Sequence, residues 1–355
     1  MGVYSLFEQF VLSLFDSTFQ PDETKPHDFK ISSYSLYLPW SMEKIIDPVS
    51  KEALSDELNK DRYVRKANNG DNEIYIITAH NAPNVMREIG RLREVTFRHA
   101  GGGTGKSIDI DDFDTSSHPY QQLIVWNPVD KEIVGAYRYI LCKDAEFIDG
   151  KVQLATTELF NFSEQFYREY LRETIELGRS FIQPLYQPAH NMRKGLFSLD
   201  NLWDGLGAIV IDNPSQKHFY GKVTMYTDFN VTARDYILTF MKHYFPDPDQ
   251  LVRPIHSVEM KTDVTAFKSV LEKLPYKEGH ALLHQHVKEH GENIPPLMNA
   301  YMNLSPTMKS FGTAINPGFG GVEETGILVT IADVYDSKKE RHFTSYLNEK
   351  KMRVK

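Results

Sequence analysis

The stretch Thr174–Ile182 (TIELGRSFI) constrains the fold of this chain most strongly. Its β-branched and aromatic residues, and the alternation of apolar and polar positions at its start, predict a central β-strand. Glu176 and Arg179 place opposite charges where a core strand is usually apolar, and Gly178 between them weakens a regular strand. Side chains three apart on a regular strand face opposite sides of the sheet. A β-bulge near Gly178 would bring both charges into one site; the alternative is a buried Glu–Arg ion pair without chemistry.

Around this strand, strands and helices alternate from residue 72 onward. We expect strands at 74–78, 121–126, 132–141, 174–182, 218–226, 310–315 and 325–331. We expect helices at 82–98, 162–172, 196–211, 232–244 and 295–304, and a mostly helical insertion at 258–291. The turn at 128–131 joins two of the strands into a hairpin. This order predicts an α/β (α+β) domain over residues 72–335.

The two ends of the chain lie outside that pattern. Residues 1–71 form an amino-terminal extension, in which apolar side chains at helical spacing over 3–19 predict a helix that packs on the domain. Contact of this helix with a membrane surface is the alternative. Residues 336–355 form a basic tail, which we expect to be solvated. Docking of the tail to an acidic partner or to anionic lipid is the alternative.

Composition narrows the classes of function. The 355 residues carry a net charge of −8 without a broad basic stripe, which argues against a nucleic-acid partner. Cys142 is the single cysteine, so neither a disulfide framework nor a cysteine-based zinc site is expected. The sequence shows no apolar run of about 18 residues and no secretory signal. These features predict a cytoplasmic location, and association with the inner face of the membrane stays open.

Two motifs suggest ligands but lack the surroundings that such ligands need. Residues 100–107 (AGGGTGKS) are similar to a phosphate-binding loop. A predicted helix precedes them and an acidic, strand-like segment follows, so we interpret them as a flexible loop or lid. Four histidines form two pairs with a spacing that can bind metal: His280, His284, His286 and His290. The step between the pairs rotates them off one helix face, so we expect an exposed polar helix and no metal site.

Four aspartates form an acidic cluster after the glycine-rich loop: Asp109, Asp111, Asp112 and Asp114. They lack the spacing of a calcium loop, and so many carboxylates repel one another unless cations lie nearby. Arg93 on the preceding helix and Arg138 on the second hairpin strand are candidates, and a substrate ammonium is another. A solvated acidic loop is the alternative.

Two basic residues, Arg193 and Lys194, stand just before the helix expected at 196–211. Backbone amides at a helix amino terminus favour anions. The two side chains are therefore candidates for contact with a phosphate or pyrophosphate group.

Four short motifs, in this order along the chain, resemble those of GNAT acyltransferases. They are LREVTF with Arg93, DDFD with Asp111 and Asp114, GAYR with Arg138, and ELGRSFI with Glu176 and Arg179. Within the GNAT fold they resemble the branch that includes acyl-homoserine-lactone synthases and the hemolysin-like, ornithine-lipid-type N-acyltransferases. The segment 202–207 (LWDGLG) also looks like that branch. The resemblance covers about residues 72–332 and implies a mixed, mostly antiparallel central sheet flanked by helices.

This resemblance implies an N-acyltransferase of aminolipid synthesis. A fatty acyl group, with 3-hydroxyacyl as one option, would move from a thioester to the amine of a small amino acid, ornithine or glycine. The donor would be an acyl carrier protein or coenzyme A, a co-substrate and not a bound cofactor. The GNAT pyrophosphate loop is not cleanly present, because 192–197 (MRKGLF) has one glycine, which is compatible with an acyl carrier protein. Arg193 and Lys194 would then bind the donor phosphopantetheine.

The resemblance, together with the needs of amine acylation, implies roles for the remaining residues. Glu176 would accept the proton of the amine, and backbone amides at the Gly178 bulge would hold the developing oxyanion. Asp111 and Asp114 would hold the acceptor ammonium or orient the arginines. The substrate-binding set comprises Arg93, Arg138, Gly178 and Ser180. Arg138 and Arg179 would contact the acceptor carboxylate or serve only to balance the acidic cluster. We expect strands 174–182 and 218–226 to splay around an apolar cleft for the acyl chain. Transfer to a hydroxyl or a protein lysine, and a non-catalytic lipid-binding module, are the alternatives.

Overall fold

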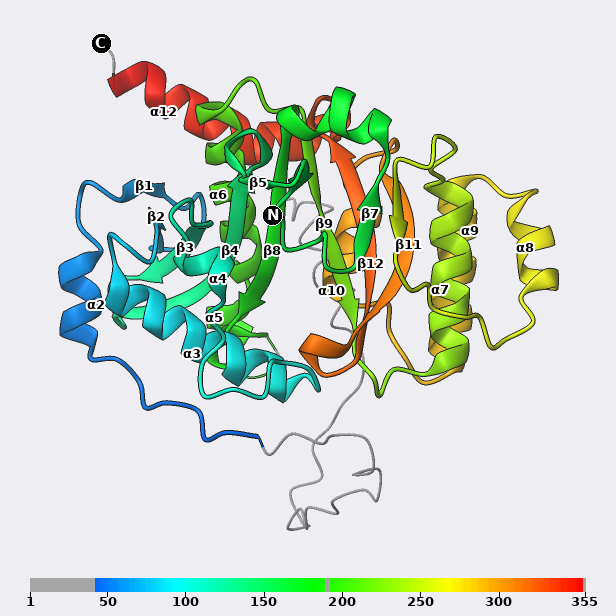
Figure 1. Ribbon diagram of the computed structural model, residues 1–355, viewed down its shortest axis with the longest axis horizontal. Helices are drawn as coiled ribbons and strands as arrows, with labels where there is room; N and C mark the ends of the chain where they lie inside the picture. Colours follow the sequence, from blue (N-terminus) through cyan, green and yellow to red (C-terminus); the bar gives the residue numbers. More distant parts are fainter. Residues whose placement is uncertain (1–41, 189, 191, 354–355) are drawn as a thin grey trace, which may run out of the picture. The chain divides into compact units, whose positions relative to one another are not determined.

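A twisted eight-stranded sheet is the centre of the fold in the computed structural model, which describes residues 42–188, 190 and 192–353 (Figure 1). In spatial order its strands are β1 (Tyr63–Lys66), β2 (Glu73–Ile77), β3 (Gln121–Asn127), β4 (Glu132–Leu141), β8 (Thr174–Ile182), β9 (His218–Met225), β12 (Val322–Thr330) and β11 (Lys309–Asn316). Neighbouring strands are antiparallel except β8 and β9, which are parallel. The predicted mixed, mostly antiparallel sheet is confirmed.

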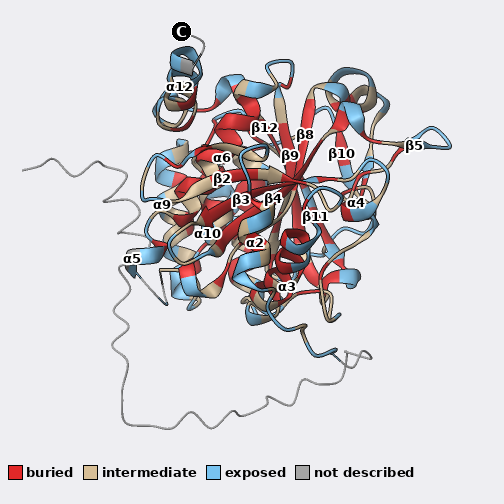
Figure 2. Ribbon diagram, turned by 90° about the vertical axis from the view of Figure 1, so that its left-hand side faces the viewer, coloured by how far each residue is buried: buried red, intermediate tan, exposed pale blue. Residues whose placement is uncertain are grey.

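Helices cover both faces of this sheet. Leu123 and Val125 of β3 belong to one buried cluster with residues of α6 (Ser198–Asp212) and α7 (Val231–Tyr244), whereas Ile124 faces α3 (Pro83–His99). This alternation is the period of two expected for a strand buried on both sides. Residues 142–173 cover the rest of the α3 face. Figure 2 shows the buried residues gathered along the sheet and on the helix faces that contact it.

The remaining elements are short, apart from α9. The other helices are α2 (Lys51–Glu57), α4 (Asp112–Thr115), α5 (Met192–Gly195), α8 (Thr265–Leu271), α9 (Tyr276–Glu289), α10 (Pro296–Met302), α11 (Asp336–Lys339) and α12 (Ser345–Arg353). Two small ladders pair β5 (Phe147–Ile148) with β6 (Lys151–Val152) and β7 (Phe160–Phe162) with β10 (Val252–Pro254). Single turns of 3₁₀ or π helix lie at Cys142–Asp144, Phe166–Tyr170, Leu171–Glu173, Pro184–Tyr186, Pro317–Phe319, Ile331–Asp333 and Glu340–Thr344.

The carboxyl-terminal part of the extension expected at residues 1–71 belongs to the sheet. Strand β1 pairs with β2, with Tyr63 opposite Tyr75. Helix α2 precedes β1 and is capped by the side chain of Ser50, which accepts a hydrogen bond from the backbone of Ala53. The helix expected at residues 3–19 lies outside the described residues.

The insertion at 258–291 is helical, as predicted, but its histidine-bearing helix is not an exposed polar helix. Helix α9 packs against α7 through the buried Leu283. The His286 ring stacks on Tyr236 with centroids 4.7 Å apart, and His280 lies 5.8 Å from Phe240. The expectation failed because α7 supplies an aromatic face, and a helix from a distant part of the sequence can bury half-polar rings against it.

The basic tail is not a free, solvated segment. Residues 336–353 are helical and lie along α6, where Arg341 Nη2 is 2.7 Å from Asp200 and His342 Nδ1 is 2.7 Å from Asp204. Lys350 pairs with Asp212, the last residue of the same helix. The solvated-tail interpretation was wrong because it counted the charges of the tail without the acids of α6, which are far away in sequence. Within the described residues, no helix combines the length and the apolarity needed to cross a membrane.

Candidate active site

The predicted bulge in β8 is present. On β4, Ala136 and Arg138 are two residues apart, but their partners on β8, Phe181 and Gly178, are three apart. The extra residue is accommodated at Arg179, which has a left-handed backbone with φ of 48°. A bulge of this kind redirects the side chain of the bulged strand. Arg179 therefore reaches the same face of the sheet as Arg138.

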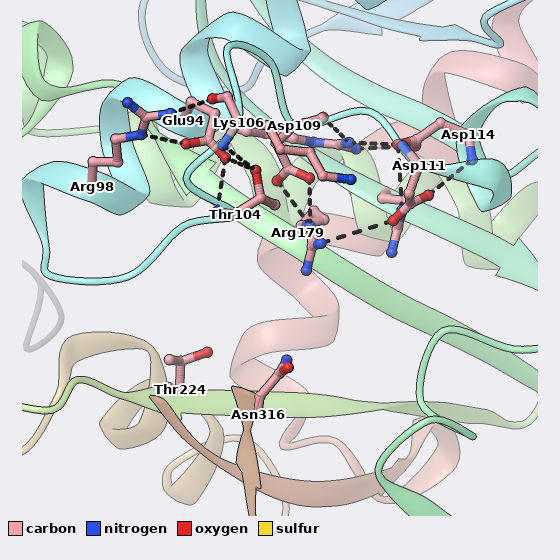
Figure 3. Close-up of polar contacts among 12 residues, drawn as sticks. Glu94, Arg98, Thr104, Lys106, Asp109, Asp111, Asp114, Arg179, Thr224 and Asn316 are labelled. Atoms are coloured by element: carbon pink, nitrogen blue, oxygen red, sulfur yellow. Dashed lines mark hydrogen bonds and ion pairs between the residues drawn. The ribbon is translucent and has the colours of Figure 1, made fainter. Parts of the chain in front are cut away.

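Strands β8 and β9 part immediately beside this bulge. Their parallel ladder runs from Thr174 opposite His218 to Leu177 opposite Gly221 and then ends. The predicted splaying of the two strands is confirmed. Figure 3 shows Arg179 on one side of the opening, with Thr224 and Asn316 on the other.

A small pocket of about 60 Å³ lies at the opening. It is lined by Asp111, Phe113, Arg138, Ala155, Glu158, Arg179, Lys222, Asn316, Gly318 and Phe319. Charged and polar groups make up most of this wall. The pocket therefore suits a small charged molecule, and it is not the apolar cleft that an acyl chain would need.

The arginines expected beside the acidic cluster are there. Asp111 caps α4 in a reciprocal box with Asp114, each carboxylate accepting from the other residue's backbone N–H at 3.2 Å. Arg93 Nη1 donates to Asp114 at 2.8 Å, and Arg138 Nη1 donates to Asp111 at 2.7 Å. A fifth residue, Gln122, joins Arg93 to Asp114. The alternative of a solvated acidic loop is therefore wrong.

Burial and charge act in opposite directions on this network. Burial of Asp114 alone would raise its pKa, but the charges of Arg93 and Arg138 outweigh burial and hold the pKa well below its usual range. Burial likewise tends to lower the pKa of Arg138, and Asp114 and Asp111 together raise it. Arg93 is fully buried beneath the pocket, so it positions Asp114 and does not border the open space.

Arg179 does not pair with Glu176. Its Nε lies 2.9 Å from Asp109, and its guanidinium lies over the ring of Phe319 at 4.4 Å. Asp111 is within 3.8 Å of the same guanidinium. The alternative of a buried Glu176–Arg179 ion pair is therefore wrong, and the bulge does not bring the two charges into one site, because Asp109 and Asp111 take up the guanidinium of Arg179.

Glu176 is held by other partners. Its side chain is 1 % exposed and is not among the groups that line the pocket. One carboxylate oxygen accepts from the hydroxyl of Tyr120, and the other accepts from the backbone N–H of Thr156 at 2.9 Å. Both oxygens are thus engaged by the protein itself. This geometry gives Glu176 no direct contact with a molecule in the pocket.

Three further predicted residues lie in different surroundings. Ser180 hydrogen-bonds with Tyr137, which belongs to the core on the α6 face, away from the pocket. Lys194 Nζ is 2.6 Å from Asp130 in the β3–β4 turn. The side chain of Arg193 lies outside what the structure describes. The predicted roles of these residues stay predictions.

Sequence reasoning missed the wall of the pocket opposite the bulge. Lys222 of β9 pairs there with Glu324 of β12, and Asn316 donates to the same carboxylate at 3.0 Å. The available signal was Lys222 in β9 and two adjacent glutamates in β12, within strands that are otherwise largely apolar. Glu158, in the loop after β6, was missed as well, because nothing in its local sequence marks it.

The glycine-rich loop at 100–107 is tied to α3 rather than free. The buried carboxylate of Glu94 accepts from the backbone N–H of Thr104 at 2.8 Å and pairs with Arg98 (Figure 3). Gly102 approaches Tyr226 so closely that an added Cβ would lie 3.0 Å from its ring. The loop thus packs beside the site, and the hypothesis of a freely moving loop does not fit these contacts.

One group of side chains has the chemistry of a metal site. Asp200, Asp204 and His342 are buried, with one ligand atom of each within 4.8 Å of the others. Asp204 already accepts from His342 and Asn68, and Asp200 accepts from Arg341. A metal ion would have to displace these donors. The group therefore serves the attachment of the tail to α6.

Comparisons with known proteins agree with this geometry. Residues 92–194 match the model of the family described as "Acetyltransferase (GNAT) domain". A protein of Bacteroides thetaiotaomicron named "Glycine N(alpha)-acyltransferase" is 53 % identical over 307 residues, which cover 86 % of this chain and 91 % of that protein. A protein of Phocaeicola vulgatus with the same name is 51 % identical over 313 residues, covering 87 % and 95 %. No solved structure gives a significant match.

Proposed function

Because the chain belongs to the GNAT-fold N-acyltransferases, we propose that it transfers a fatty acyl group from a thioester to the α-amine of glycine. The chain is an acyltransferase that acts on the amine of an amino acid. The identity of that amino acid, the donor and the fate of the product form the proposal. Placement in the hemolysin-like branch stays a prediction.

The size of the pocket is the observation that favours glycine over ornithine. Its volume of about 60 Å³ is roughly four to six times the space that one water molecule requires. Glycine has no side chain, whereas ornithine adds three carbons and a second amine. The aromatic rings of Phe113 and Phe319 border the pocket where such a side chain would need room. The names of the two relatives support the same acceptor.

The charges around the pocket suit an amino acid with both of its charged groups. Arg179 and Lys222 line opposite walls and would hold the carboxylate between them. Asp111, whose side chain is 31 % exposed, would hold the ammonium. Asp114 and Arg93 are buried behind it and would keep Asp111 and Arg138 in place. The sequence assigned Arg138 to the carboxylate as well, but its buried Nη1 already donates to Asp111.

The bulge would supply the oxyanion site. Beyond Leu177, no ladder partner on β9 takes up the backbone of β8, because the two strands have parted. Backbone N–H groups at Gly178 and Arg179 would then be available to the thioester carbonyl oxygen as negative charge develops on it. The donor would approach along this opening, with its acyl chain pointing away from the polar pocket.

For the donor we propose an acyl carrier protein, with coenzyme A as the second candidate. The single glycine of segment 192–197 supports this choice. Lys194 also pairs with Asp130, so its positive charge is already used and is not available to the pyrophosphate of coenzyme A. A carrier protein presents its phosphopantetheine without the adenosine diphosphate part of coenzyme A. The product, an acylated glycine, would enter aminolipid synthesis, and contact with the membrane surface would follow from its acyl chain.

The test incubates the purified protein with an acyl carrier protein thioester or with acyl-coenzyme A, and offers glycine, alanine or ornithine. Thiol release and product mass are followed. We expect acylglycine from the carrier thioester, with kcat/KM for ornithine lower by about 100-fold or more. Equal rates with ornithine would overturn the choice of glycine. Release only with a hydroxyl or a protein lysine, or no release despite tight acyl binding, would overturn the function.

A further inference from the structure

Acylation of an amino acid requires loss of a proton from its ammonium, and a group of the protein or a water molecule must accept this proton. Glu176 is buried, and the protein engages both of its oxygens. A base must lie within hydrogen-bond reach of the proton, directly or through one water. The candidate bases are therefore the carboxylates that line the pocket.

Of the described residues that line the pocket, Asp111 and Glu158 carry carboxylates. Asp111 accepts from Arg138 with both oxygens at 2.7 Å and also caps α4. A proton on Asp111 would weaken these bonds and leave a buried guanidinium short of negative charge, which is costly. Glu158 is exposed, and within the described part of the chain no hydrogen bond or ion pair engages its side chain.

The turn that carries Glu158 is held firmly although its side chain is free. The backbone N–H of Thr156 donates to Glu176 at 2.9 Å, and that of Ala155 donates to the Tyr120 hydroxyl at 3.0 Å. The N–H of Leu159 closes the turn on the carbonyl of Thr156. Two buried groups therefore hold Ala155 and Thr156, which precede Glu158, and the bond from Leu159 closes the turn after it. The backbone that carries Glu158 is therefore already in place at the pocket when a substrate binds.

We propose that Glu158 is the proton acceptor of the acyl transfer, and that Glu176 and Tyr120 are positioning residues for its turn. This inference rests on the proposed function. The ammonium of glycine gives one proton to the Glu158 carboxylate, which passes it to solvent. The amine nitrogen then forms the C–N bond with the thioester carbon. The C–S bond breaks, its electron pair leaves on sulfur, and a second proton from nitrogen converts the thiolate into a thiol.

The test compares Glu158→Gln with Glu164→Gln, an exposed glutamate on the same connecting segment. At neutral pH we expect Glu158→Gln to lower kcat/KM for glycine by about 100- to 10,000-fold, with the KM for the donor unchanged. The deficit should shrink as the pH rises toward the pKa of the amine, because free amine then forms in solution. Glu164→Gln should match the unmodified protein.

Two outcomes would overturn the proposal. One is activity of Glu158→Gln within about threefold of the unmodified protein at neutral pH. The other is a deficit of the same size at every pH, which marks a structural role. Acylglycine formation by the unmodified protein tests the proposed function separately, so failure of the base and failure of the function are distinguishable.

Discussion

The hydroxyl of Tyr120 donates a hydrogen bond to Glu176, and both groups are buried beneath the candidate active site. Burial, followed by the charge of Glu176, raises the pKa of the Tyr120 hydroxyl well above its usual value, so it stays a donor. The same oxygen accepts from the backbone of Ala155. This pair connects the central strand β8 to the turn that borders the pocket.

Replacing Tyr120 with Phe should therefore destabilise the protein. The change leaves one oxygen of Glu176 and the N–H of Ala155 without their partner, and we expect a loss of about 2–3 kcal/mol in the free energy of unfolding. Urea denaturation measures this loss. Tyr167→Phe is the matched control, because no hydrogen bond engages its hydroxyl within the described residues, and its loss should stay below about 0.5 kcal/mol. Equal losses would contradict the role of the Tyr120 hydroxyl.

Replacing Asp114 with Asn should be more severe. Arg93 and Arg138 are buried around this carboxylate, and removing its charge leaves them undercompensated, at a cost of about 3–5 kcal/mol. Chemical denaturation of Asp114→Asn beside Asp112→Asn, an exposed neighbour on α4, measures the difference. The idea fails if the two variants are equally stable.

The same carboxylate makes a prediction for acid stability. Its pKa is depressed in the folded protein, so in acid the unfolded chain binds the proton first. The contribution of Asp114 is then complete above the usual aspartate pKa of about 3.9 and is lost as the pH falls below it. If Asp114→Asn is still folded at pH 5, its free energy of unfolding should depend less steeply on pH below 4 than that of the unmodified protein. An unchanged slope would contradict the contribution of the Asp114 carboxylate to acid stability.

Replacing Phe113 with Ala should relax the choice of acceptor. The ring of Phe113 borders the pocket and leans against Tyr120, with centroids 5.6 Å apart. Its removal makes room for a side chain, so the ratio of kcat/KM for ornithine to that for glycine should rise by about 10-fold or more. The measurement lets both acceptors compete in one reaction, so that any loss of folded enzyme cancels in the ratio. A constant ratio would place the selection of glycine elsewhere.

His280 should make the protein sensitive to mild acid. Burial, and then the neighbouring His284, lower the pKa of His280 to about 4, and Asn299 bonds its neutral ring at 2.9 Å. The unfolded chain takes up this proton near pH 6.5, so stability present above that pH is lost as the pH falls toward 4. The loss reaches up to about 3 kcal/mol.

Thermal or urea unfolding between pH 4 and pH 7 checks this expectation. His280→Gln should remove most of the pH dependence in that window, whereas His256→Gln, at an exposed position, should leave it intact. A dependence that survives the loss of His280 would assign the effect to other groups.

The fold was accessible to sequence reasoning because its strands and helices carry strong local periodicity. The expected strands at 121–126, 132–141 and 174–182 match β3, β4 and β8 within a residue. The bulge was predictable for the same local reason, because Glu176, Gly178 and Arg179 conflict with a regular strand. The network around Asp111 and Asp114 followed from charge balance.

The rest of the site depends on contacts between distant segments. Lys222 and Glu324 meet because β9 and β12 are neighbours in a particular register, which no local pattern reveals. Glu176 was expected to face a substrate, but Tyr120 and the turn at Thr156 arrive from elsewhere and cover it. The basic tail was misjudged for the same reason, since its partners lie on α6.

The attachment of that tail also sets the order in which the molecule can be completed. His342 contacts Asp204, and Ser345 contacts Arg65 near the start of the sheet, across 280 positions of the chain. During synthesis, α6 and the first strands leave the ribosome long before these partners exist. Asp200 and Asp204 of α6 therefore stay exposed to water until Arg341 and His342 have been made. These contacts can therefore form only after residue 345 has been made, so truncations before residue 341 should leave the acids of α6 without these partners.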